Sequence, residues 1–205
     1  MAAAASLPET PHLPEMLPEQ QMLLSGVSWK EYVILRELLD RPNLRMTYCE
    51  GALELMTTSR IHELWKKTIA RLVELYALEA DLPLVGYGST TFQSEAAARG
   101  VEPDECYRIG TLMKDGEFPD VVLEVIYTNP LLNKLNVYKG LDVPEVWVFK
   151  KASFELYGLK NGEYERLERS NFLPALDFEL IARFATREDQ HQALLELRDS
   201  LRSKP

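Results

Sequence analysis

The chain has 205 residues, enough to bury one sizeable core, and its 27% of charged residues is ordinary for a globular protein. A formal net charge of −9 weighs against a broadly basic nucleic-acid-binding body, although a local basic groove remains compatible with it. Cys49 and Cys106 lie far apart and lack metal-finger spacing, so we expect two buried thiols in a reducing compartment. The sequence shows neither a signal-peptide pattern nor an apolar run near the ~20 residues of a membrane span, which makes the cytoplasm the expected location, with no membrane partner.

The N-terminal part is expected to change from a tail to a folded domain. Residues 1–22 are rich in proline and predict a disordered tail, and residues 23–205 predict a single domain that includes the C-terminal helices. Regular structure is expected to begin with a helix over 28–40, where Ser28 and Glu31 have the spacing of a capping box.

A hairpin and a series of further elements follow along the chain. Residues 45–56 predict the hairpin, with its turn at Glu50-Gly51, and the helical spacing of apolar residues predicts a long helix over 60–80. Strands are expected near 84–93, 104–109, 120–126, 145–150, 153–159 and 163–167, a short helix at 130–141, and two final helices with Asp177 and Thr186 as N-caps. This order predicts an α/β fold in which helices flank a mixed β-sheet.

Two of the expected strands contain acidic residues among apolar ones. The stretches are DECYRIG at 104–110 and DVVLEVI at 120–126. Asp120 and Glu124 share a face but lie roughly 13 Å apart, too far to hold one ion, whereas Asp104 and Glu124 could do so from neighbouring strands. A buried carboxylate without a partner costs several kcal/mol, and a divalent cation is a common remedy. The alternative is that these acids lie at strand ends or on a solvated face.

Three longer stretches resemble the Uma-type restriction endonuclease family, which is part of the PD-(D/E)XK nuclease superfamily. They are PDVVLEVIYTNPLLNKLNVYKGLDVPEVWVF, YCEGALELMTTSRIHE upstream of it, and EPDECY between the two. The resemblance covers roughly residues 28–160 and depends on the order and spacing of the motifs together. It implies a restriction-endonuclease-like fold and an endonuclease that hydrolyses DNA.

The resemblance also assigns roles to individual residues. It implies that Asp104 and Glu124 are metal carboxylates for Mg²⁺, with Mn²⁺ as a possible substitute, and that Lys134 is the catalytic lysine. Ile126 stands where the superfamily usually has its lysine, and the segment between Glu124 and the next helix is about four residues shorter than in the common family form. Two other functions remain open: a nonenzymatic binding or dimerisation module that keeps the nuclease fold, and a phosphodiesterase acting on a small or RNA substrate.

Several residues near these motifs have both a functional and a structural interpretation. His62 and Glu63, at a helix start, are possible accessory residues of the site, and a partly exposed structural histidine is an equal alternative. For Glu54 a solvated hairpin face is favoured, for Asp120 the entry of a strand, and for Tyr138 packing on the same helix face as the lysine.

Basic and apolar surface residues give two further expectations. Several cations are most simply a solvated helix face, but together they could attract phosphate; they are Lys66, Lys67, Arg71, Lys134 and Lys139. A homodimer is expected because apolar residues remain near the end of the chain, namely Leu194, Leu195, Leu197 and Leu201.

Overall fold

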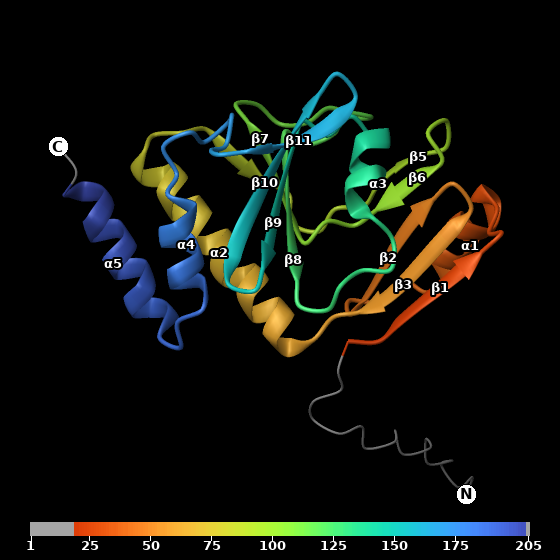
Figure 1. Cartoon of the computed structure of the whole chain (residues 1–205), viewed down its shortest axis with the longest axis horizontal. Helices are drawn as coiled ribbons and strands as arrows, with labels where there is room; N and C mark the ends of the chain where they lie inside the picture. The colour runs from red at the N-terminus through yellow and green to blue at the C-terminus, as the bar shows by residue number, and fades with distance from the viewer. Residues whose placement is uncertain (1–18, 204–205) are drawn as a thin grey trace, which may run out of the picture.

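The strands form two sheets that lie side by side along the long axis of the molecule (Figure 1). The computed structural model describes residues 19–203. The expected α/β class with flanking helices is confirmed, but the strands divide into a five-stranded and a six-stranded sheet instead of forming one. Most of the expected N-terminal tail, residues 1–18, lies outside the described residues. None of the helices in the described part of the chain is long and apolar enough to cross a membrane.

The five-stranded sheet is entirely antiparallel, in the order β1-β3-β2-β6-β5. The predicted hairpin is confirmed as β2 and β3, and its turn residues Glu50 and Gly51 have φ values of 48° and 91°. Glycine tolerates this left-handed backbone without a steric penalty. The strands are β1 (Gln21–Ser25), β2 (Leu44–Cys49), β3 (Ala52–Thr57), β5 (Phe92–Ser94) and β6 (Arg99–Val101), and α1 (Trp29–Leu38) packs on the sheet.

Strand β1 was not expected from the sequence. It pairs along its whole length with β3, so the predicted tail boundary at residue 22 falls inside a strand. The last proline of the tail is Pro18, and every residue of β1 therefore has an N–H available for pairing. The predicted capping box of α1 is confirmed, because Ser28 and Glu31 bond each other's backbone N–H groups.

The six-stranded sheet has the order β11-β10-β9-β8-β7-β4, and β8 and β9 are its parallel pair. The helix α3 connects these two strands, as parallel neighbours require a crossover. The strand expected over 84–93 is divided between the two sheets, with an interruption at Gly88, which has a φ of 63°. The strands are β4 (Leu84–Gly86), β7 (Glu105–Ile109), β8 (Val121–Ile126), β9 (Glu145–Lys150), β10 (Ser153–Lys160) and β11 (Glu163–Leu167).

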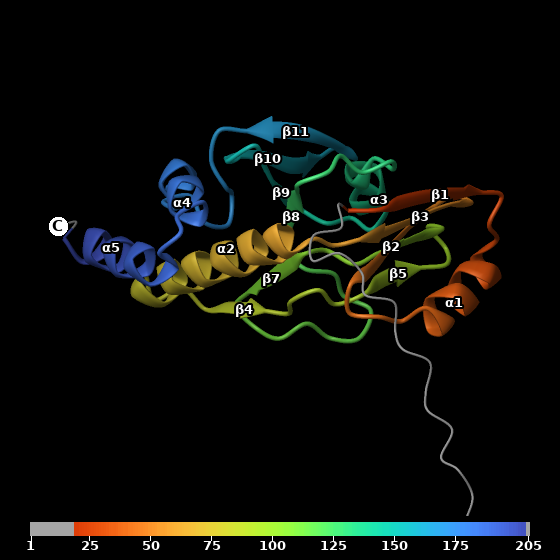
Figure 2. The same ribbon diagram turned by 90° about the horizontal axis from the view of Figure 1, so that it is seen from below.

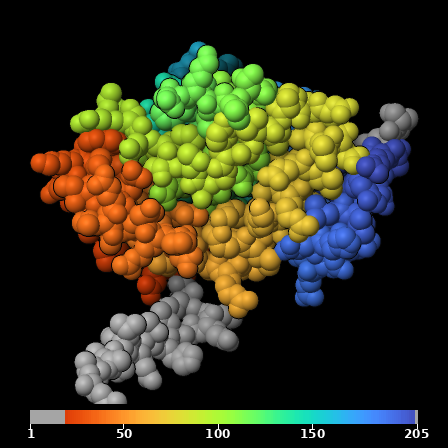
Figure 3. Space-filling model, turned by 180° about the vertical axis from the view of Figure 1, so that it is seen from behind, coloured from red at the N-terminus to blue at the C-terminus, as the bar shows by residue number. Residues whose placement is uncertain are grey.

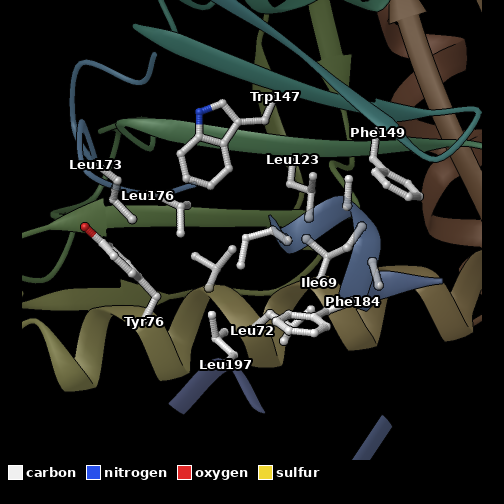
Figure 4. Packing of buried hydrophobic residues seen from close by; sticks show 14 of the residues in the cluster. Ile69, Leu72, Tyr76, Leu123, Trp147, Phe149, Leu173, Leu176, Phe184 and Leu197 are labelled. Atoms are coloured by element: carbon white, nitrogen blue, oxygen red, sulfur yellow. The ribbon is translucent and has the colours of Figure 1, made fainter. Parts of the chain in front are cut away.

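The main core lies between one face of the six-stranded sheet and three helices, α2 (Arg60–Glu79), α4 (Phe178–Ala185) and α5 (Gln190–Arg202). Figure 4 shows side chains of α2, such as Leu72, packed between the sheet residue Trp147 and the C-terminal helices. The long helix at 60–80 and the cap at Asp177 are confirmed. Thr186 is instead the C-cap of α4, and Asp189 caps α5 because its carboxylate accepts the Gln192 N–H at 2.9 Å.

The other face of the six-stranded sheet packs against α3 (Lys134–Gly140), which also contacts β2 and β6 of the five-stranded sheet. This helix therefore lies at the junction of the two sheets. Helices α1 and α5 lie at opposite ends of the molecule (Figure 2), and α2 forms much of the surface between them in the view from behind (Figure 3).

Candidate functional site

Two buried carboxylates face each other across neighbouring strands of the six-stranded sheet. Strands β7 and β8 pair antiparallel with Glu105 opposite Leu123. Extending this register by one residue places Asp104 opposite Glu124. Each of these two residues is only 2% exposed. The two strands that carry these acids are therefore neighbours, as a shared ion site requires. The alternative of a solvated face is wrong for both acids, whereas Asp104 does lie at a strand end, directly before β7.

Helix α3 supplies two partners for Glu124 from a single face. Lys134 and Tyr138 are four residues apart, so both side chains point to the same side of the helix. The ammonium of Lys134 lies 2.6 Å from Glu124 Oε2, and the Tyr138 hydroxyl donates a hydrogen bond to Oε1. Tyr138 does pack in the core, as expected, but packing alone is an incomplete description. The helix begins at Lys134 instead of near residue 130, because Asn133 caps it there by accepting the Leu135 N–H.

Helix α2 supplies the partner for Asp104. Ser59 caps this helix, and His62 in the first turn is buried with Nε2 at 3.1 Å from Asp104 Oδ2. The same carboxylate oxygen accepts the Val125 N–H at 2.7 Å, which ties Asp104 to β8. The Nδ1 of His62 lies 3.5 Å from a carboxylate oxygen of Glu63. The structure thus brings His62 to the acid pair and places Glu63 behind it, and the expectation of a partly exposed histidine is wrong.

The charges at this site balance in pairs. Burial alone would lower the pKa of His62, but the hydrogen bond to Asp104 and the nearby carboxylate of Glu63 outweigh it and raise the pKa to about 9. Burial opposes ionisation of Asp104, yet the hydrogen bond and charge of His62 hold its pKa below the usual value. Burial raises the pKa of Glu124, and the neighbouring carboxylates raise the pKa of Lys134 despite its own burial. The raised pKa of Lys134 favours its ammonium, whereas the raised pKa of Glu124 favours its neutral acid. The 2.6 Å contact between the two groups favours charge on both, so the pair is ionised.

Glu54 also belongs to the site, although the sequence favoured a solvated hairpin face for it. It is 2% exposed, so the predicted solvated hairpin face is wrong. Its two carboxylate oxygens accept the N–H groups of Leu131 and Leu132 at 2.8 and 3.2 Å, in the loop that leads into α3. Its charge also contributes to the raised pKa of Lys134. Alternation along β3 could not reveal this, because both faces of that strand are covered.

The loop between β8 and α3 is fastened from the N-terminal side as well. Glu19, within the predicted tail, accepts hydrogen bonds from the Ser59 hydroxyl at 3.1 Å and the Thr128 N–H at 3.0 Å. Gln21 in β1 donates to the Asn129 carbonyl at 2.9 Å. The five-stranded sheet and the segment before it therefore hold the loop that carries Lys134 into the site. Asp120, by contrast, is the strand-entry residue that was expected, and its carboxylate bonds Arg108 and the Ile109 N–H.

The predicted phosphate-attracting patch does not form as one surface. Lys66 pairs with Glu63 on α2, whereas Lys139 pairs with Glu163 at 3.0 Å on the opposite side of the six-stranded sheet. Of the others, Arg71 donates to Gln190 of α5 at 3.3 Å. Lys67 remains on α2, and Lys134 is the only one of these five cations that contacts the acid pair.

The donor set of the acid pair suits a hard divalent cation, although it is small. Across residues 19–203, no group of three or more His, Cys, Asp or Glu side chains is arranged to hold a metal ion. Mg²⁺, however, is commonly held by one or two carboxylates, with water and phosphate oxygens completing the shell. Asp104 and Glu124, on opposed strand positions, offer that donor chemistry. Glu124 also remains available, because each of its oxygens has a second lone pair beyond the bond from Lys134 or Tyr138.

Comparison with known proteins gives one family. No curated protein matches the chain. The family model Uma2, described as "Putative restriction endonuclease", matches residues 29–186. The match includes both strands of the acid pair, α2 with His62, and α3 with Lys134. It also extends past the resemblance seen in the sequence, through the core helix α4. The chain therefore belongs to the Uma2 family.

Proposed function

We propose that this protein is a metal-dependent endonuclease that hydrolyses phosphodiester bonds in DNA, with Asp104, Glu124 and Lys134 as its catalytic residues. The observation that carries the proposal is the opposition of Asp104, directly before β7, and Glu124 on β8, with the Lys134 ammonium 2.6 Å from Glu124. Two carboxylates and one ammonium in a water-poor recess are the groups that phosphodiester hydrolysis requires. Membership of a family described as a restriction endonuclease supports the same reaction class.

Each residue has a distinct role in this proposal. Asp104 and Glu124 hold the ion, and Lys134 donates to a non-bridging oxygen of the scissile phosphate, where negative charge develops. A bound Mg²⁺, or Mn²⁺ in its place, would lower the pKa of a water molecule and offset charge on the phosphate. In the reaction the water oxygen forms a bond to phosphorus and releases one proton to solvent, the bond to one sugar oxygen breaks, and that leaving oxygen takes up one proton from solvent. His62 is a positioning residue, because it touches Asp104 and holds that carboxylate in one orientation.

One observation favours a nonenzymatic alternative. His62 and Lys134 already compensate the charges of Asp104 and Glu124, so the site is balanced without an ion. A descendant that kept the fold as a binding or dimerisation module could retain such pairs for stability. Metal binding separates the two functions, because a module of this kind has no need of an ion.

The first test measures metal binding without any nucleic acid. Mg²⁺ or Mn²⁺ should raise the melting temperature of the wild type, since a ligand bound only by the native state stabilises it. At about 100 times its Kd an ion adds ~2.7 kcal/mol, or roughly 5–10 °C for a chain of this size. The isosteric variants Asp104→Asn and Glu124→Gln should lose the shift. An equal shift in both variants would place the ion elsewhere.

The second test measures hydrolysis of supercoiled plasmid and of circular single-stranded DNA with Mg²⁺ or Mn²⁺. The wild type should cut at least one of them, Asp104→Asn and Glu124→Gln should cut neither, and Lys134→Met should be slower by about 10²–10³-fold. Asp120→Asn is the matched control, because Asp120 directly precedes the strand that carries Glu124 but bonds Arg108. Cutting that survives in both acid variants would refute the assignment, and an inactive wild type without metal-dependent stabilisation would favour the nonenzymatic module.

A homodimer remains part of the proposal, with less support than the sequence suggested. Leu197 is buried, and Leu194 and Leu201 pack against the same core, so these residues are largely used within one chain. Sedimentation at micromolar concentration tests the prediction. A single species of 23.5 kDa would refute it.

A further inference from the structure

Two of the three proposed catalytic residues, Glu124 and Lys134, line a pocket of about 370 Å³. Its floor is the sheet face of β8, β9 and β10 that carries Glu124, Lys150 and Tyr157, and the loop at 129–133 with the start of α3 lines its other side. Lys134 lies at the boundary between this cover and the floor. The volume falls at the lower end of the ~300–1,000 Å³ typical of pockets that enclose a small molecule. A single nucleotide belongs to that size class.

The acid pair and its lysine lie in a recess. The side chains of Glu124 and Lys134 are 2% and 11% exposed, so a phosphate must enter the pocket to reach both. Duplex DNA is stiff, and bending a short site by 40–90° costs on the order of 1–6 kcal/mol. Moving one nucleotide out of a duplex costs a few kcal/mol more, whereas a single strand is free of that cost. The depth of the site therefore favours an unpaired strand.

The charge around the pocket favours a substrate that uses few phosphate contacts. Duplex-binding proteins commonly neutralise several phosphates over a broad basic face. Here the chain has a net charge of −9, and two of its candidate cations, Lys66 and Lys139, are paired with glutamates. Within residues 19–203, Lys150 at the pocket has no carboxylate within ion-pair distance. It is therefore available for one phosphate next to the one that Lys134 would contact.

One aromatic ring of the pocket could receive a base. Tyr157 lines the floor and is partly exposed, and its hydroxyl is fixed by a 2.9 Å hydrogen bond to Glu155. A base stacked on an aromatic side chain is the usual way in which proteins hold single strands without reading their sequence. Tyr157 and Lys150 thus provide one stacking surface and one cation beside the catalytic groups.

We infer that the site takes an unpaired DNA strand, with one base in the pocket against Tyr157 and a flanking phosphate on Lys150. This substrate class rests on the proposed nuclease function, since it assumes that Glu124 and Lys134 act on a phosphodiester. Unpaired strands of this kind occur in single-stranded DNA, in gapped duplexes and in the transiently opened regions of supercoiled plasmid.

A binding experiment tests the inference with catalysis prevented. A fluorescent oligonucleotide is titrated with the protein in Ca²⁺ as a single strand, as the full duplex, and as the same duplex with an unpaired internal gap. We expect the single strand and the gapped duplex to bind at least about tenfold more tightly than the full duplex. Tyr157→Leu should weaken single-strand binding by about tenfold. Lys150→Gln should lose one phosphate contact, which lowers the steepness of log Kobs plotted against log salt concentration by ~0.7.

The neighbouring Lys151 is the matched control, because it is exposed in the β9–β10 turn and lies outside the pocket. Lys151→Gln should bind like the wild type, and unchanged melting temperatures should show that all variants are folded. Equal or tighter binding of the full duplex, or pocket variants that bind like Lys151→Gln, would overturn the inference.

Cleavage of the same three substrates in Mg²⁺ separates this inference from the function on which it rests. Cutting of the single strand and the gap alone supports both. If the full duplex is cut at an equal rate and Tyr157→Leu does not change that rate, the proposed nuclease function is supported and the inferred role of the pocket is overturned. Single-strand binding that depends on Tyr157 and Lys150, without any cutting, supports the pocket as a strand-binding site and refutes the nuclease.

Discussion

Removing the ammonium of Lys134 should destabilise the protein as well as slow the proposed hydrolysis. Lys134→Met keeps the length and apolar stem of the side chain but leaves Glu124, at 2% exposure, without its countercharge. Breaking a buried pair from one side typically costs ~3–5 kcal/mol. Tyr138 continues to donate to Glu124, so we expect the lower end, about 3 kcal/mol. For a chain of this size that corresponds to a fall of roughly 6–12 °C in melting temperature.

The double variant Lys134→Met/Glu124→Gln provides the decisive comparison. It removes the buried charge together with its partner, so most of the lost stability should return and the coupling free energy should reach ~2 kcal/mol. Urea unfolding in EDTA at pH 8 measures the free energy of unfolding of the wild type, the two single variants and the double variant. Lys139→Met is the matched control, because its partner Glu163 is well exposed and the loss should stay below ~1 kcal/mol. Additive single and double variants would show that the pair is not coupled and would refute the ionised arrangement.

Three further predictions concern residues around the site. Glu54→Ala leaves two loop amides without their acceptor and should lower the free energy of unfolding by ~2–4 kcal/mol. Glu54→Gln keeps one acceptor and should lower it by less. Equal losses for the two variants in urea unfolding would contradict this role of Glu54. Gly100→Ala should cost at least ~1–3 kcal/mol, since its Cβ would overlap the buried ring of Tyr32, and thermal unfolding within 1 °C or so of wild type would contradict this. In EDTA, His62 should stabilise the fold through Asp104 by ~1–3 kcal/mol below its ordinary pKa of 6.5, and this stability should be lost as pH rises through its folded pKa of about 9. The stability difference between wild type and His62→Gln should therefore shrink with rising pH, and a constant difference would refute the ion pair.

Local patterns were sufficient for most of the elements of the fold. The capping box at Ser28, the turn at Glu50-Gly51 and the periodicity of α2 each depend on neighbouring residues, which the sequence displays directly. The division of the strands into two sheets depends on long-range pairing, such as β2 with β6, and no local pattern encodes it. Strand β1 was missed for the same reason, because an edge strand beside a proline-rich segment becomes recognisable only through its partner β3.

The same distinction applies to the site. The acids at 104 and 124 could be found because they interrupt apolar strands, and the family resemblance supplied Lys134. His62 was named only as an accessory residue, since its hydrogen-bond partner Asp104 is distant in the sequence and the local pattern around His62 does not indicate it. Glu54 was considered, but a solvated hairpin face was favoured for it, because alternation identifies which residues share a face but not what covers that face.

Glu54 explains how the segment between Glu124 and α3 can place the lysine. The segment between Glu124 and α3 is short, and Ile126 leaves no cation on the strand itself. A loop of this kind could hold its lysine in many positions unless its backbone were fixed from outside. The carboxylate of Glu54 fixes two consecutive amides immediately before the helix cap, which positions the first turn of α3. In the proposed function the five-stranded sheet would therefore contribute through position, because it helps to determine where the ammonium of Lys134 meets Glu124.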